Sequence, residues 1–243
     1  MSLIWQARRD GRHYQVRGAG RTRRLYTDGV LHSQYHPQRP LTGNLWDLLG
    51  LPALWLAPGR LRRVLVLGVG GGAVIRMLTH FFSPDDIVGV DSDALHLLLA
   101  RRFFGLRHAC LVRADARDWL RAWRGPDFDY IVDDLFVGTD GEPRRALPVD
   151  AGWRDALLRR LRPGGVLVVN FASAAEARRS ALRACAPPRR LFSFSTPQNE
   201  NRVHALVPGG CDSAQLRERI VQHPDLARAL RRARLRYQVR RLA

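Results

Sequence analysis

The chain has 243 residues, of which 46% are hydrophobic and 26% are charged. This length and apolar content suit one globular domain, or a core domain with a small addition, and they exclude intrinsic disorder. The longest apolar stretches are only as long as a core strand, so we expect no membrane span and no membrane partner. The first residues contain neither a long apolar run nor a small-residue cleavage site, so the sequence predicts a cytoplasmic protein.

The net charge of +18 comes entirely from arginine, because the 40 basic residues include no lysine. A basic surface attracts nucleic acid, anionic substrates or acidic proteins. The arginines are spread along the whole chain and no RNA-binding module accompanies them, so compositional bias is favoured over nucleic-acid binding. A field this positive also disfavours small polycationic substrates unless local carboxylates reverse it. The three cysteines lie far apart and the histidines are scattered, so no disulfide framework and no metal site are expected.

The first 40 residues are predicted to form short strands joined by turns. The pairs Asp10-Gly11 and Asp28-Gly29 are strong hairpin signals. The expected strands are Leu3 to Ala7, His13 to Arg17, Arg24 to Tyr26 and Val30 to Tyr35. This section is too small to hold a core alone, so it must pack on the main domain or on a second subunit.

After a helix expected over Asn44 to Trp55, apolar strands alternate with helices. This alternation is typical of a parallel sheet that is covered on both faces. The expected strands are Val64 to Leu67, Ile87 to Val90, Ala109 to Val112, Tyr130 to Val132 and Val166 to Asn170.

The last third of the chain departs from this alternation. Leu191 to Ser195 and Arg202 to Leu206 are expected to form a hairpin, which at the end of a parallel sheet is typical of the methyltransferase type of Rossmann fold. We therefore expect an α/β protein with three parts: a small N-terminal β section (residues 1–40), a Rossmann-like domain (41–210) and an Arg-rich C-terminal helical tail (211–243).

The first strand of the alternating region runs into Gly68-Val69-Gly70-Gly71-Gly72, which opens a helix. Glycines allow a sharp turn and let a ligand approach the main chain, but this pattern alone fits dinucleotides, sulfonium nucleosides and structural turns. Asp91 ends the next strand, where a carboxylate can accept the ribose hydroxyls. Asp93 is expected to cap the helix that follows.

Further acidic residues follow the next two strands. Asp115 can accept a hydrogen bond from an exocyclic adenine amine, and Asp133 and Asp134 end the fourth strand. Carboxyl ends of successive parallel strands line the crevice where open α/β sheets bind ligands. The sequence thus predicts an acidic site for an adenine nucleoside at this edge of the sheet.

These motifs together resemble those of spermidine synthases and their methyltransferase-like relatives. The similar segments are Val64 to Arg76, Asp91-Ser92-Asp93, Ala114-Asp115-Ala116, Asp129 to Asp134 and, upstream, Leu25 to Val30. The resemblance implies a class I fold that binds S-adenosyl-L-methionine (SAM) or decarboxylated SAM, and it suggests a homodimer formed through the N-terminal strands.

The resemblance also implies roles for single residues. Gly68, Gly70 and Gly72 would line the methionine-derived part of the donor, with Gly71 in the same loop. Asp91 would hold the ribose, Asp115 and the adjacent Ala116 the adenine, and Asp133 would be the catalytic carboxylate.

Three departures from the family pattern bear on the chemistry. The glycine loop of aminopropyltransferases reads G-G-G-D-G-G, and its Asp, which holds the donor's ammonium group, is Gly71 here. The second Asp of the family's D-S-S-D-P motif, which helps to bind the diamine, is Phe136. A Tyr-Gln pair of the polyamine channel is replaced by Thr42-Gly43-Asn44.

These departures favour methyl transfer from SAM, because buried ammonium groups without paired carboxylates are costly. The alternatives are aminopropyl transfer from decarboxylated SAM and a non-catalytic protein that binds polyanions. In the favoured mechanism Asp133 holds or deprotonates an attacking amine, Asp134 shares that task or caps the next loop, and Phe136 forms an apolar wall. The acceptor stays open between a small molecule, a protein side chain and nucleic acid.

Overall fold

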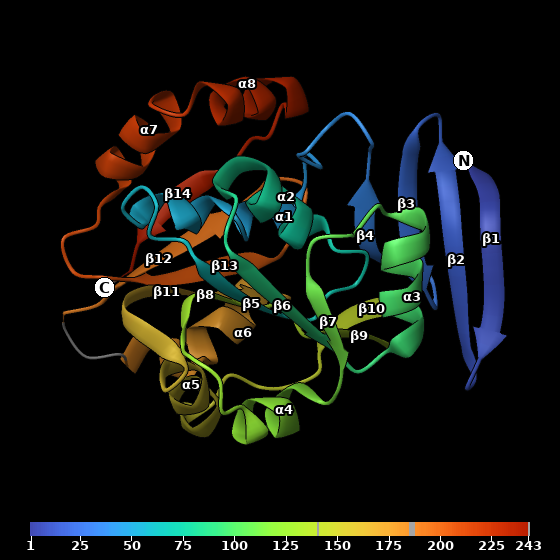
Figure 1. The fold of residues 1–243 in the computed structure, drawn as a ribbon, viewed down its shortest axis with the longest axis horizontal. Coiled ribbons are helices and arrows are strands. Elements are labelled where there is room, and N and C mark those ends of the chain that lie inside the picture. Colours follow the sequence, from blue (N-terminus) through green and yellow to red (C-terminus); the bar gives the residue numbers. More distant parts are fainter. Residues whose placement is uncertain (140, 185–187, 243) are drawn as a thin grey trace.

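The computed structural model describes residues 1–139, 141–184 and 188–242. Figure 1 shows a central sheet with helices above and below it, and a separate antiparallel sheet that contains the N-terminus at one side. No helix in these residues is both long enough and apolar enough to cross a membrane.

The N-terminal section is an antiparallel four-stranded sheet, and the four predicted strands are confirmed. It contains β1 (Ser2–Arg9), β2 (Arg12–Ala19), β3 (Thr22–Thr27) and β4 (Val30–Tyr35), in that order. Its buried residues pack on helix α3 (Ala94–Phe103) and on the residue after it; this small core contains Tyr14, Val16, Leu25, Leu95, Leu99 and Phe104. The section therefore packs on the main domain, which is one of the two arrangements expected from the sequence.

The central sheet has eight strands in the order β14-β12-β13-β11-β8-β5-β6-β7. The five strands from β11 to β7 are parallel, and β13, β12 and β14 are antiparallel to their neighbours. The bounds are β5 (Arg63–Leu67), β6 (Asp86–Asp91), β7 (Cys110–Arg113), β8 (Phe128–Asp133), β11 (Leu161–Phe171), β12 (Arg190–Ser195), β13 (Arg202–Val207) and β14 (Gln238–Arg241). The predicted parallel sheet and its terminal hairpin are thus both confirmed.

Helices cover both faces of this sheet, because successive residues of its strands are buried on opposite sides. One face is covered by α1 (Leu45–Leu48), α2 (Ala73–Phe82), α7 (Ser213–Val221) and α8 (Pro224–Ala233). The other is covered by α4 (Ala116–Ala122), α5 (Ala151–Leu158) and α6 (Ala174–Arg179). Figure 1 shows α3 between the central sheet and the N-terminal sheet.

Three local predictions were wrong or incomplete. The helix expected over Asn44 to Trp55 is α1 followed by a separate 3₁₀ helix, Leu51–Trp55, because Pro52 offers no N–H to continue an α-helix. The C-terminal tail is helical only as far as α8; its end forms β14, which pairs with β12. The hairpin of β9 (Phe136–Thr139) and β10 (Glu142–Arg145) was not expected, since its sequence shows no apolar alternation.

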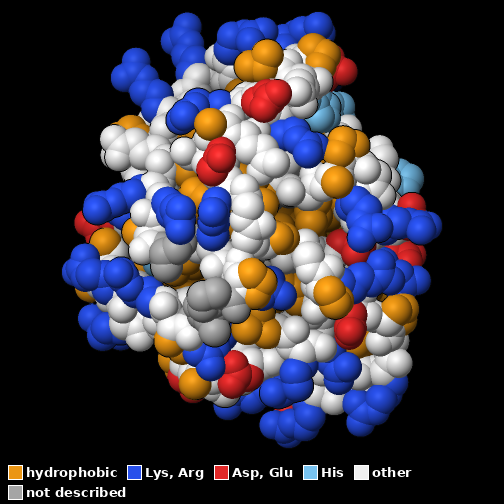
Figure 2. Space-filling view, turned by 90° about the vertical axis from the view of Figure 1, so that its left-hand side faces the viewer, with side chains coloured by type: hydrophobic (Ala, Val, Ile, Leu, Met, Phe, Trp, Pro, Cys, Tyr) orange, Lys and Arg blue, Asp and Glu red, His pale blue; other side chains and the backbone are white. Residues whose placement is uncertain are grey.

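Arginines are dispersed over the surface. The face in Figure 2 carries blue side chains around most of its outline, with acidic side chains among them. This distribution agrees with compositional bias as the main source of the positive charge. A place where charges of one sign gather, or where arginine is absent, is therefore a candidate for a binding site.

Candidate functional site

A cavity of about 280 Å³ lies at the carboxyl ends of the central strands. Its walls come from the β3–β4 turn and β4, the start of α1, the glycine loop, and the residues that follow β8, β11 and β12. Its polar lining consists of His32, Asn44, Asp91, His96, Asp134, Asn170, Asn199 and Asn201, and Phe136 adds an aromatic wall. The only ionisable lining groups among the described residues are the carboxylates of Asp91 and Asp134 and the two histidines, so we call this hollow the acidic cavity.

The glycine loop adopts the left-handed backbone conformation that glycine permits. Gly68, Gly70 and Gly72 have φ of 86°, 50° and 79°. Gly68 and Gly70 line the acidic cavity, and strand β4 lies close by: a Cβ on Gly70 would be 2.8 Å from the carbonyl oxygen of His32. Gly71 instead faces Ser33, and Gly72 faces the side chain of Leu106. Only two of the four predicted glycines therefore border the cavity.

Asp91 orients the glycine loop. Its Oδ2 accepts hydrogen bonds from the backbone N–H groups of Val69 (3.0 Å) and Gly70 (3.1 Å), and its Oδ1 accepts one from Asp93 N–H (2.9 Å). Burial alone would raise its pKa, but His96 and these N–H groups outweigh burial and lower the pKa of Asp91. A charged carboxylate thus stands in the cavity wall, at the position predicted for the ribose contact.

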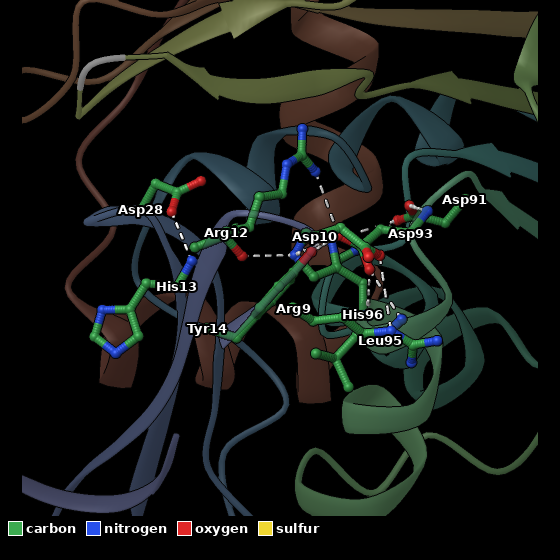
Figure 3. Close-up of polar contacts among 12 residues, drawn as sticks. Arg9, Asp10, Arg12, His13, Tyr14, Asp28, Asp91, Asp93, Leu95 and His96 are labelled. Atoms are coloured by element: carbon green, nitrogen blue, oxygen red, sulfur yellow. Dashed lines mark hydrogen bonds and ion pairs between the residues drawn. The ribbon is translucent and has the colours of Figure 1, made fainter. Parts of the chain in front are cut away.

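Asp93 caps α3 as predicted and ties the N-terminal sheet to the site. It accepts hydrogen bonds from Leu95 N–H and His96 N–H, and it also accepts one from the hydroxyl of Tyr14 at 2.7 Å. Figure 3 shows Tyr14 and Arg12 reaching from β2 toward Asp93 at the start of α3. This network fixes the N-terminal sheet against the edge of the acidic cavity.

His32 is a site residue that sequence reasoning missed. It lies on β4 with its ring centroid 4.9 Å from that of His96, and its buried Nε2 has no hydrogen-bond partner among the described residues. Burial, together with the nearby His96, lowers the pKa of His32 to about 3. The ring is therefore neutral at physiological pH and forms part of the cavity wall. A single histidine in an N-terminal strand gives no sequence signal for this role.

Asp133 and Asp134 have opposite environments although they are adjacent. The Asp133 carboxylate is fully buried, outside the cavity lining, and binds the guanidinium of Arg145 (2.8 and 2.9 Å) and the indole N–H of Trp153 (2.8 Å). Both oxygens of Asp133 are therefore bound by groups of the protein itself, which indicates that Asp133 holds the β9–β10 hairpin in place through Arg145. The catalytic role predicted for it finds no support in this arrangement.

Asp134 lines the acidic cavity and accepts a hydrogen bond from the side-chain amide of Asn170 at 2.8 Å. Burial raises the pKa of Asp134 to about 7, although Asn170 and the charge of Arg145 act in the opposite direction. A carboxylate with a pKa near neutrality is suited to general acid–base work at physiological pH.

Side-chain amides extend the polar lining away from Asp134. Asn201 donates to Asn170 at 3.1 Å, and Asn199 donates to Asn44 at 2.8 Å. Three of these asparagines were not singled out from the sequence, because they lie at a strand end and in a loop with no motif spacing. They bring hydrogen-bonding groups without charge to the cavity.

Asp115 lies outside the cavity lining. Its exposed carboxylate accepts the N–H groups of Arg117 (2.9 Å) and Asp118 (3.1 Å) and so caps α4, whose first residue, Ala116, is buried. Phe136, by contrast, lines the cavity as expected. The structure therefore brings Gly68, Gly70, Asp91, Asp134 and Phe136 together and leaves Gly71, Gly72, Asp115, Ala116 and Asp133 outside.

The fold is that of class I SAM-dependent methyltransferase-like proteins, extended by an N-terminal antiparallel sheet. Among the solved structures that share this fold are spermidine synthases. A probable spermidine synthase from Corynebacterium glutamicum superposes with a TM-score of 0.77 over 99% of this chain and 91% of that one, at 15% identity.

Two further solved structures share the fold and carry ligands. A spermidine synthase in complex with the transition-state analogue AdoDATO has a TM-score of 0.69 at 15% identity, covering 91% of this chain and 79% of that one. Human methyltransferase-like protein 13 in complex with SAH has a TM-score of 0.61 at 18% identity, covering 76% of this chain and 91% of that one. At these identities the structures establish the fold.

The sequence itself is similar to a curated protein over part of its length. Polyamine aminopropyltransferase 2 from Caldanaerobacter subterraneus subsp. tengcongensis is 28% identical over 137 residues, which are 52% of this chain and 42% of the relative. The chain thus matches less than half of that relative's length. No protein-family model matches the chain.

Proposed function

We propose that the protein is a transferase that binds an adenosyl sulfonium donor in the acidic cavity and transfers an aminopropyl group from it to an amine. The observation that carries this proposal is the pair of carboxylates, Asp91 at the end of β6 and Asp134 just after β8, in the lining of one cavity. The sequence similarity to a polyamine aminopropyltransferase supports aminopropyl transfer ahead of methyl transfer, which reverses the order expected from the sequence.

The cavity lining fits a donor of this class. A sulfonium is a cation, and no arginine lines the cavity among the described residues, although the chain contains 40 basic residues that are all arginine. Gly68 and Gly70 would lie beside the donor, and Asp91 would accept hydrogen bonds from its ribose hydroxyls. When bound, the donor supplies an electrophilic carbon next to its sulfur.

Asp134 would act on the acceptor. Ionised, it accepts a proton from an ammonium group and leaves the amine with a free electron pair for attack. Asn170 holds the carboxylate in place through its amide, and Phe136 shields one side of the acceptor from water. The protein otherwise contributes orientation and exclusion of water.

Methyl transfer from SAM is the second candidate, and a specific observation favours it. Gly71, which stands where aminopropyltransferases carry an Asp, faces Ser33 rather than the cavity, so no carboxylate from the glycine loop is available to a donor ammonium. Asp134 is also the only carboxylate on the acceptor side of the described lining. A diamine acceptor, which carries two positive charges, would therefore have one carboxylate to bind where two are expected.

The by-product of the reaction distinguishes the two candidates. Aminopropyl transfer from decarboxylated SAM releases methylthioadenosine, whereas methyl transfer from SAM releases S-adenosylhomocysteine. We expect methylthioadenosine by mass spectrometry when decarboxylated SAM is incubated with the protein and a panel of monoamines and diamines. S-adenosylhomocysteine, formed together with a methylated acceptor when SAM replaces decarboxylated SAM, would establish the second candidate. If neither by-product forms with any acceptor, the proposal is overturned.

A further inference from the structure

A second hollow, of about 350 Å³, lies between the loop after β4, helix α2 and the loop after α3. The ionisable groups that line it are all bases: Arg76, His80, Arg107 and His108. No carboxylate contributes to its lining among the described residues. We call it the basic pocket.

Arg76 is the central residue of this pocket. Its guanidinium lies 4.0 Å from the ring centroid of Tyr35 and donates one long hydrogen bond, 3.5 Å, to the carbonyl oxygen of His36. No carboxylate pairs with it in the part of the chain that the structure describes. Burial lowers the pKa of Arg76 to about 10, so the group is still protonated at neutral pH while it has lost much of its water.

The surroundings add positive charge. Burial, and then the charges of Arg39, Arg21, Arg232 and Arg76, lower the pKa of His36 at the rim, and no carboxylate opposes them. Most arginines on this protein lie on open surface, where water screens them. Here two arginines, Arg76 and Arg107, line one concave site. A partly desolvated guanidinium without a counter-ion favours the binding of an anion.

We propose that the basic pocket binds a small phosphate-bearing anion. A guanidinium presents paired N–H donors that match phosphate oxygens, and the lining combines two such groups with two imidazoles. The volume is that of a small-molecule site rather than of a groove for a polymer. The pocket shares no lining residue with the acidic cavity, so this binding is independent of the proposed transferase activity.

Thermal unfolding of the full chain tests the proposal, with phosphate and pyrophosphate added at matched ionic strength against chloride. We expect pyrophosphate to raise the Tm by several degrees at millimolar concentration, and Arg76→Gln to abolish the increase. Arg101→Gln, which removes an exposed arginine of α3 outside the pocket, should keep it. Isothermal titration should then give one site per chain in the wild type.

Three outcomes would overturn the proposal. The same Tm increase in Arg76→Gln as in the wild type would show that anions bind the basic surface at large. Stabilisation by an RNA oligonucleotide, with none from pyrophosphate, would assign the arginines to a polymer. No stabilisation by any phosphate compound would also overturn it. If Arg76→Gln fails to fold, Arg107→Gln, at an exposed position in the same pocket, serves as the test.

Discussion

The acidic cavity is lined by β4 and the glycine loop, and the basic pocket by the loop after β4 and by α2, so the two lie on neighbouring segments of the chain, yet they carry opposite charge. Each has a buried or half-buried arginine beside it. Arg145, behind the acidic cavity, is bound by both oxygens of Asp133 and by the carbonyl oxygens of Leu147 and Asn170. Arg76, in the basic pocket, has an aromatic ring and one long hydrogen bond.

This difference shows how to interpret an arginine-rich chain. An arginine whose donors are all used inside the protein belongs to the fold, because its charge is already compensated. An arginine that has lost water without gaining an anion indicates a ligand. Composition treats the two residues alike, and only their partners separate them.

The largest effect is expected from removing the carboxylate of the acidic cavity. Asp134→Asn should lower turnover by about 10²- to 10⁴-fold, because the proton acceptor is lost while the shape is kept. The Tm at pH 8 should be unchanged or higher: the pKa of Asp134 is raised to about 7, so its ionisation costs stability as the pH rises from about 4 to above 7. Steady-state kinetics and thermal unfolding measure the two effects.

The exposed carboxylate of Asp118 provides the matched control. Asp118→Asn should change neither turnover nor the Tm by a measurable amount. If Asp134→Asn instead keeps wild-type turnover, the carboxylate has no part in the chemistry. The acidic cavity and the basic pocket would then differ only in the charge of the ligand that each one binds.

The next largest effect tests the contrast between the two arginines. Asp133→Asn leaves the guanidinium of Arg145 buried without a counter-charge, and it should lower the free energy of unfolding by about 3–5 kcal/mol. Arg76→Gln removes the contact with Tyr35 and one long hydrogen bond, and it should change that free energy by no more than about 1 kcal/mol. Urea unfolding of the two variants measures both values, and equal losses would remove the distinction.

Much of this fold could be predicted from the sequence, because apolar strands that alternate with helices can form only a few kinds of sheet, of which a parallel sheet covered on both faces is the usual one. The site was less predictable. Two adjacent aspartates end β8, and the sequence cannot show which one faces the cavity, since that depends on Arg145 reaching back from the β9–β10 hairpin. His32 and Asn199 come from the N-terminal sheet and a late loop, and only the tertiary fold brings them to the strand ends.

The pH dependence of turnover should report the pKa of Asp134. Activity that needs the ionised carboxylate is present above about pH 7 and is lost as the pH falls below that value. Asn170→Ala removes the amide that lowers this pKa, so the acidic limb should move to higher pH by a fraction of a unit to about one unit. Asn199→Ala changes the cavity without touching Asp134, and its limb should not move. A limb that stays in place in Asn170→Ala would assign it to another group.

The smallest effect concerns Asp115, which the resemblance assigns to the adenine and the structure places as the cap of α4. Asp115→Ala should lower the free energy of unfolding by about 1 kcal/mol, and Asp115→Asn, which keeps a capping oxygen, should be nearly neutral. Neither variant should change the KM for the donor, because the carboxylate lies outside the lining of the acidic cavity. An increased KM in Asp115→Ala, with kcat unchanged, would place the adenine at the start of α4 and extend the donor site beyond this cavity.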